Sequence, residues 1–191
     1  MSAGGARRPP SMDARPRTTT NLDGYGAPTI AWDRVAAVLA DPVTEAPDTG
    51  GPNRHTHWLA TIDPDGSPHV MPVGALHLDG VLYFTSGPGT RKSRNIGRDA
   101  RCVVTVATHP FDLVVKGTAE RVTDPDVLGT VAATYRQGGW PASVDGDALT
   151  AEFSAPAAGP PPWHVYRVVP ATVFALGTAE PYGATRFDLE G

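Results

Sequence analysis

The sequence predicts a mainly β protein whose antiparallel strands curl into a barrel. Gly and Pro supply 21 and 20 of the 191 residues, a composition typical of many tight turns rather than of a helical bundle. Short apolar runs also follow one another closely between about residues 57 and 122, with turn residues between them. Consecutive hairpins of this kind build an antiparallel sheet that closes on itself.

The N-terminal part of the chain precedes these strands. Residues 1–28 are rich in Arg, Pro, Thr and Gly, and we expect a disordered basic tail there. A short amphipathic helix is predicted from Thr29 to Pro42, because apolar side chains recur on one helical face at Trp32, Val35, Ala36 and Leu39. A Pro/Gly/Asp-rich linker follows, to about Asn53. We expect residues 29–191 to form a single domain.

The central strands are predicted from their apolar patterns and their turns. Asp79-Gly80 favours a tight hairpin turn in which both residues have positive φ. A short helix is predicted over residues 91–98, after a loop that contains glycine. The predicted strands are 57–62, 68–78, 81–85, 102–108 and 113–122.

The clearest helix of the sequence follows the central strands. Thr123 is its expected N-cap, Pro125 lies in its first turn, and Gly138-Gly139 end it. Residues 140–162 are predicted to form a long loop, which acts as a lid or as an interface arm. A last strand is predicted over 163–176, interrupted at Pro170, which cannot donate a ladder hydrogen bond.

Composition excludes several classes of function. The net charge of −4 argues against a dedicated nucleic-acid binder, and no apolar run is long enough to span a membrane. Cys102 is the only cysteine and lies in an apolar strand, so we expect a packed thiol in a cytoplasmic protein without disulfides. His55 and His57 share one strand face, but no further ligand has suitable spacing, so no metal site is expected.

Residues 86–93, Ser-Gly-Pro-Gly-Thr-Arg-Lys-Ser, form what we call the anion loop. Cations at the start of a helix oppose its dipole, and a bound phosphate would remove that conflict, with help from the loop's hydroxyls and free N–H groups. The alternative is a basic helix that only faces solvent. Known nucleotide loops do not fit, because Ser86 and Arg91 stand where the Walker pattern requires glycine.

The stretch from Trp58 to Val106 resembles the pyridoxamine-phosphate-oxidase-like superfamily, whose fold is the FMN-binding split β-barrel. It is especially similar to the flavin/deazaflavin oxidoreductase branch. The segments that carry the resemblance are Leu59–His69, Val70–Val73, Leu82–Ser86 and Arg91–Val104. One departure is that the residues that bind the substrate phosphate in pyridoxamine phosphate oxidases have no match near the C-terminus, so oxidation of vitamin B6 is not expected.

The resemblance implies a homodimer with two cofactor sites at the subunit interface. The ring system would lie against the second central strand, and hydroxyl and basic groups after the third would hold the phosphate. A tryptophan of the partner chain that stacks near the ring is also consistent with the family. The site residues implied in this way are Met71, Pro72, Val73, Gly74, Thr85, Ser86, Arg91, Lys92, Ser93 and Trp163.

The function that follows is an oxidoreductase that moves a hydride between bound coenzyme F-420 or FMN and a small organic substrate. F-420 is slightly favoured, because the basic stretch extends beyond the needs of one phosphate. No catalytic residue is identified, and hydride transfer requires no protein nucleophile. The alternative is a non-catalytic protein of the same fold that carries or senses a flavin, a deazaflavin or a haem, with His69 as an axial ligand in the haem case.

Overall fold

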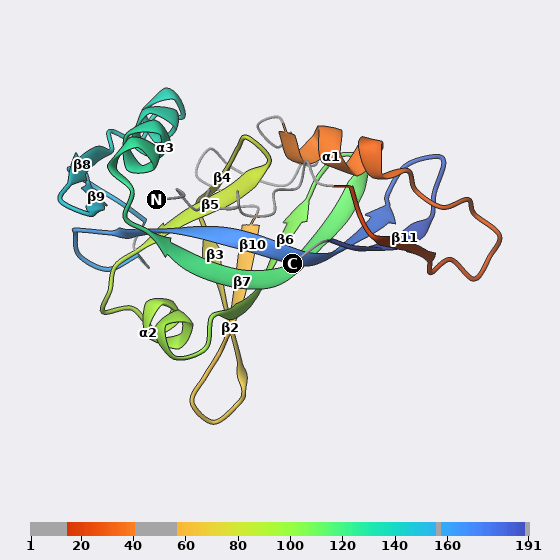
Figure 1. Cartoon of the computed structure of the whole chain (residues 1–191), viewed down its shortest axis with the longest axis horizontal. Helices are drawn as coiled ribbons and strands as arrows, with labels where there is room; N and C mark the ends of the chain where they lie inside the picture. The colour runs from red at the N-terminus through yellow and green to blue at the C-terminus, as the bar shows by residue number, and fades with distance from the viewer. Residues whose placement is uncertain (1–14, 41–56, 156–157, 190–191) are drawn as a thin grey trace, which may run out of the picture.

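In the computed structural model, residues 15–40, 57–155 and 158–189 are described. Within them, the main sheet has nine strands in the order β1-β11-β10-β7-β6-β2-β3, and β4 and β5 join it through β10 (Figure 1). All its pairings are antiparallel. The strands are β1 Thr18–Asn21, β2 His57–Ile62, β3 Pro68–Val73, β4 Ala75–Leu78, β5 Val81–Ser86, β6 Arg101–Ala107, β7 Phe111–Val122, β10 His164–Gly177 and β11 Ala184–Asp188. The predicted β-rich, antiparallel split-barrel class is confirmed.

The predicted strand 68–78 is in fact two strands that separate at Gly74. β3 pairs with β2, whereas β4 pairs with β5. The chain therefore passes from one part of the barrel wall to the other at this residue. The hairpin after β4 has the predicted turn, with φ of 50° at Asp79 and 67° at Gly80.

Side chains that alternate along the strands fill the barrel interior. Leu59, Val104, Val115 and Val173 point inward from four neighbouring strands and are buried. Helix α1 (Trp32–Ala40) packs on the same core, with the Trp32 ring 4.9 Å from that of Phe187. Its expected end at Pro42 lies outside the described residues.

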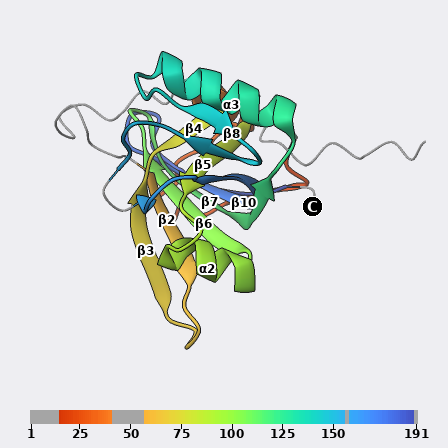
Figure 2. The same ribbon diagram turned by 90° about the vertical axis from the view of Figure 1, so that its left-hand side faces the viewer.

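A second, smaller core lies on the other face of β5 and β10. Helix α3 (Pro125–Gln137) and the β8–β9 hairpin (Ser143–Asp145, Ala148–Thr150) cover it. Figure 2 shows α3 on one side of these strands and α2 (Arg91–Arg98) on the other. The segment expected to be a long loop therefore contains a hairpin. The N-cap is Asp124 instead of Thr123, because the Asp124 carboxylate accepts hydrogen bonds from the N–H groups of Asp126 and Val127.

β10 continues through Pro170 as one strand, and the predicted interruption of its ladder at this residue takes the form of a bulge. The register between β7 and β10 shifts between Pro170 and Thr172, so a bulge places the proline where no ladder hydrogen bond is needed. β1 and β11 were not predicted, and β1 lies in the segment expected to be disordered. Residues 18–21 are ordered there because they pair with β11 at the sheet edge. No described helix is long and apolar enough to cross a membrane.

Candidate functional site

The anion loop joins the end of β5 to the start of α2, and local hydrogen bonds fix its shape. Thr90 is the N-cap of α2, because its Oγ1 accepts from the Ser93 N–H at 3.3 Å. Thr90 Oγ1 also donates to the Gly87 carbonyl at 2.9 Å and lies 2.7 Å from Ser86 Oγ. The predicted helix start is therefore confirmed, and two hydroxyls of the loop lie together.

Lys92 and Ser93 are directed into the protein. Lys92 has 5% of its surface exposed, and this burial lowers the pKa of its ammonium group. Ser93 Oγ is buried and has no hydrogen-bond partner among the described residues. A buried hydroxyl without a partner costs free energy, and a partly desolvated ammonium interacts more strongly with an anion. Both features suit a phosphate at this position.

The arginines of α2 have other partners. Arg91 lies 3.5 Å from the Asp63 carboxylate, and its side chain is 53% exposed. Arg94 donates to the Gly89 carbonyl and Arg98 donates to the Ile62 carbonyl. Arg94 and Arg98 thus attach the helix to neighbouring backbone carbonyls. This agrees with the alternative interpretation, in which these cations lie on the solvent-facing side of the helix and bind no anion.

Thr85 and Ser86 do not converge on one point, although both were predicted to hold the phosphate. Successive side chains of a strand point to opposite faces. Ser86 meets Thr90, on the side of α2, whereas Thr85 hydrogen-bonds Tyr135 of α3. The predicted site residues therefore form two groups, one at the anion loop and one beside α3.

The group beside α3 contains a residue that the sequence did not identify as part of the site. The hydroxyl of Tyr135 donates to the Gly74 carbonyl at 3.1 Å and also hydrogen-bonds Thr85. Burial raises the pKa of this phenol, and the hydrogen bond from Thr85 opposes the rise. The helical pattern only indicated that Tyr135 is packed, and it contains no signal for a partner 61 positions away.

The segment Met71–Gly74 does not present one face. Met71 pairs with Leu59 and points inward, and Val73 is buried in the barrel core. Pro72 points outward beside Trp58, its cross-strand partner. Gly74 is exposed at the break between β3 and β4. A ring lying against this segment would contact its backbone and the outer side of Pro72, and that contact stays a prediction.

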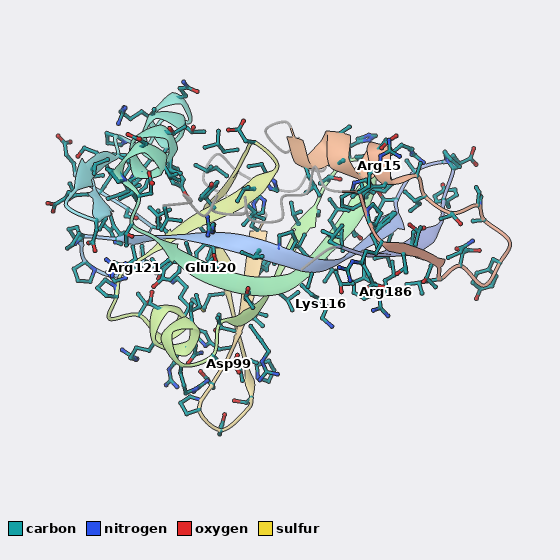
Figure 3. All side chains as sticks on the ribbon, viewed as in Figure 1. Arg15, Asp99, Lys116, Glu120, Arg121 and Arg186 are labelled. Atoms are coloured by element: carbon teal, nitrogen blue, oxygen red, sulfur yellow. The ribbon has the colours of Figure 1, made fainter. Side chains whose placement is uncertain are left out.

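His164, at the start of β10, and Arg121, near the end of β7, were not predicted as site residues. His164 is the cross-strand partner of Ser86. Desolvation lowers the pKa of His164, and the charge of Arg121 lowers it further. Arg121 forms an ion pair at 2.7 Å with Asp147, which lies between β8 and β9, and Figure 3 shows Arg121 at the end of β7. No local pattern in the sequence indicates these two residues, because they approach each other only through the pairing of β7 with β10.

Trp163 is placed in a packed position. Its exposed fraction is 2%, its Nε1 donates to the Gly159 carbonyl at 2.8 Å, and its ring lies 5.5 Å from that of Trp140. The same loop reaches the anion loop, since the Gly87 N–H donates to the Ala158 carbonyl at 2.7 Å. Trp163 thus supports the loop that borders the site, and its direct contact with a cofactor stays a prediction.

Other candidate groups lie away from this site. No cluster of three or more potential metal ligands occurs among the described residues, and His55 lies outside them. His57 and His77 form a buried pair, with their Nε2 atoms 3.1 Å apart. Cys102 is buried, which raises the pKa of its thiol to about 12. Such a thiol is not an activated nucleophile.

The architecture and the loop define a class of protein, the cofactor-binding split barrels. A family model described as pyridoxamine 5'-phosphate oxidase matches residues 44–177, and the chain belongs to this family. A comparison with curated protein sequences gave no match.

Several solved structures share the fold. A protein of unknown function from Agrobacterium tumefaciens is 24% identical with a TM-score of 0.52, and the match covers 84% of this chain and 62% of that one. The chain thus spans less than two thirds of that protein. A conserved hypothetical protein from Mycobacterium tuberculosis is 17% identical with a TM-score of 0.51, covering 81% and 89%. A putative pyridoxamine 5'-phosphate oxidase from Listeria innocua is 17% identical with a TM-score of 0.50, covering 75% and 96%.

Proposed function

We propose that this protein is an oxidoreductase that binds a flavin or a deazaflavin and uses it to move a hydride to or from a small organic substrate. The observation that carries the proposal is the buried end of the anion loop. Ser93 Oγ is buried and has no hydrogen-bond partner among the described residues. The ammonium group of the preceding residue, Lys92, is partly desolvated. Such groups fit the phosphate of a cofactor better than they fit solvent.

The chain's own residues divide the work of binding. Ser86, Thr90, Lys92 and Ser93 would hold the phosphate at the start of α2. The backbone of residues 71–74 and the Thr85–Tyr135 pair would border the ring. When bound, the cofactor supplies the hydride chemistry, and the protein supplies orientation and exclusion of water.

The choice between coenzyme F-420 and FMN rests on charge around the site. Lys92 is directed into the protein, and Arg91 lies before it at the exposed start of α2. Arg91 adds a second positive charge next to Lys92, more than one phosphate needs, which favours the longer anionic tail of F-420. This preference agrees with the extent of the basic stretch in the sequence.

We further propose that two copies associate through the outer face of β2, β3 and β6. This face carries what we call the outer patch, Trp58, Val70, Pro72 and Val103. Trp58 is 46% exposed and Val70 is 50% exposed, unusual values for large apolar side chains in strands. Because Pro72 belongs both to the outer patch and to the expected ring-binding segment, a second subunit there would adjoin the cofactor.

Titration of the purified protein with FMN, and separately with F-420, tests the function. We expect tight binding of one of them, seen as quenching of its fluorescence. If neither cofactor binds, the proposed function is wrong.

Turnover then separates the enzyme from a carrier. The protein loaded with reduced cofactor is mixed with a panel of small acceptors, and cofactor absorbance is followed. We expect oxidation to be faster than in a mixture without protein. Binding with no such acceleration would identify a carrier of the same fold.

A further inference from the structure

Tyr135 connects three parts of the barrel that meet at Gly74. Its ring belongs to the small core under α3 and lies edge-on to Trp140, with 5.0 Å between the ring centres. Its hydroxyl leaves that core and donates to the Gly74 carbonyl at 3.1 Å. The Thr85 side chain on β5 is its other partner. One phenol therefore links α3, β5 and the point where β3 ends and β4 begins.

The hydrogen bond from Tyr135 restrains the peptide of Gly74, which has few other restraints. β3 pairs with β2 and β4 pairs with β5, and the registers of both pairs exclude Gly74. Gly74 is exposed and has no side chain, so its peptide can rotate more freely than its neighbours. A hydrogen bond to its carbonyl fixes the orientation of that peptide.

The protonation state of Tyr135 suits this role. Burial raises the pKa of the phenol, so the group keeps its proton at any physiological pH. A protonated phenol can donate to Gly74 and accept from Thr85 at the same time. A phenol with a raised pKa is a poor proton donor to a substrate, which argues for a positioning role instead of acid catalysis.

We propose that Tyr135 is a positioning residue for the cofactor ring, acting through the Gly74 peptide and Thr85. This inference rests on the proposed function, because it assumes that the ring lies against residues 71–74. Holding the peptide in one orientation before binding lowers the entropy that binding must remove. The phenol also sets the distance between β5 and the strand break, which is where the ring must fit.

The test compares Tyr135→Phe with Tyr83→Phe. The first variant keeps the ring and its contact with Trp140 but loses the hydroxyl. Tyr83 packs in the same small core from β5, so its variant controls for loss of a phenol there. Thermal unfolding and far-UV circular dichroism confirm that each variant folds. The readouts are the Kd for FMN and for F-420 and the visible circular dichroism of the bound cofactor, which reports how the ring is held.

We expect Tyr135→Phe to raise Kd about five- to tenfold, as for loss of one hydrogen bond, and to change the visible circular dichroism. Tyr83→Phe should change neither. Thr85→Val should resemble Tyr135→Phe, and the double variant should add little, because both changes break one network. A folded Tyr135→Phe with wild-type Kd and spectrum would overturn the inference and leave the proposed function standing. Wild-type protein that binds neither cofactor would overturn both.

Discussion

The Nε2 atoms of His57 and His77 lie 3.1 Å apart inside the barrel, where both side chains are buried. One ring must donate and the other accept, so the pair is stable only when both imidazoles are neutral or share a single proton. Burial lowers the pKa of His77 from 6.5 to about 4, and the Leu39 carbonyl only partly opposes the shift.

This pair predicts a loss of stability in mild acid. The unfolded chain binds a proton at His77 near pH 6.5, whereas the folded protein does so near pH 4. The contribution of neutral His77 to the free energy of unfolding is therefore fully present above about pH 6.5. It is lost as the pH drops toward 4, by on the order of 3 kcal/mol. Urea unfolding of wild type and His77→Gln between pH 7 and 4.5 measures it. The slope with pH should be smaller in His77→Gln, and His109→Gln, which alters an exposed imidazole, should keep the wild-type slope.

The structure of the anion loop predicts that Lys92, and not Lys116, contributes to cofactor binding. Lys92→Gln should weaken binding of the preferred cofactor roughly 10- to 100-fold, because a charge-assisted hydrogen bond is lost. The matched control is Lys116→Gln, which removes the chain's other lysine, on the exposed face of β7 and apart from α2 in Figure 3. Calorimetric titration gives both affinities. Equal losses in the two variants would mean that the phosphate lies elsewhere.

Two glycines of the loop provide a matched pair for stability. A Cβ at Gly87 would lie 2.7 Å from the Ala158 carbonyl oxygen, whereas a Cβ at Gly89 would meet nothing within 4 Å. Gly87→Ala should lower the free energy of unfolding by about 1–3 kcal/mol and displace the loop around Gly159. Gly89→Ala should stay within about 0.5 kcal/mol of wild type. Denaturant unfolding of both variants decides, and indistinguishable curves would refute the close contact.

The outer patch predicts the state of assembly. Trp58→Asp should convert the proposed dimer to a monomer, because a charge would replace a large apolar side chain at the contact. Tyr25 is fully exposed in a different part of the chain, so Tyr25→Asp serves as the control for adding a charge. Sedimentation velocity measures the mass of each. A wild-type monomer at micromolar concentration, or a Trp58→Asp dimer, would contradict the prediction.

Local signals allowed much of the fold to be predicted. Asp79-Gly80 specifies its hairpin through backbone conformations that only a few residues adopt, and α2 begins at a hydroxyl N-cap. The break at Gly74 could not be predicted, because the residues on both sides of it continue one alternating pattern. Which strand each half pairs with depends on β2 and β5, far away in the sequence.

The sequence predicted the continuous part of the candidate site, but not the residues that come together only in the fold. The anion loop is one continuous segment, so its composition was enough to identify it. Its separation into an inward group at Lys92 and Ser93 and an outward group at Arg91 and Arg94 depends on packing. Tyr135 and His164 reach the site only through long-range contacts, with Gly74 and with β5, and no local pattern encodes those.

The long strand β10 also bears on how the protein is made. It pairs with β5, β7 and β11, but it follows β5 by about 80 residues. At a synthesis rate of about 5–20 residues per second, β10 is synthesised roughly 4–16 seconds after β5. During that interval the β4–β5 hairpin has an open edge and apolar side chains such as Leu82 and Phe84 that are not yet covered. The nascent chain should therefore be most prone to capture by chaperones, and to aggregation, until β10 leaves the ribosome.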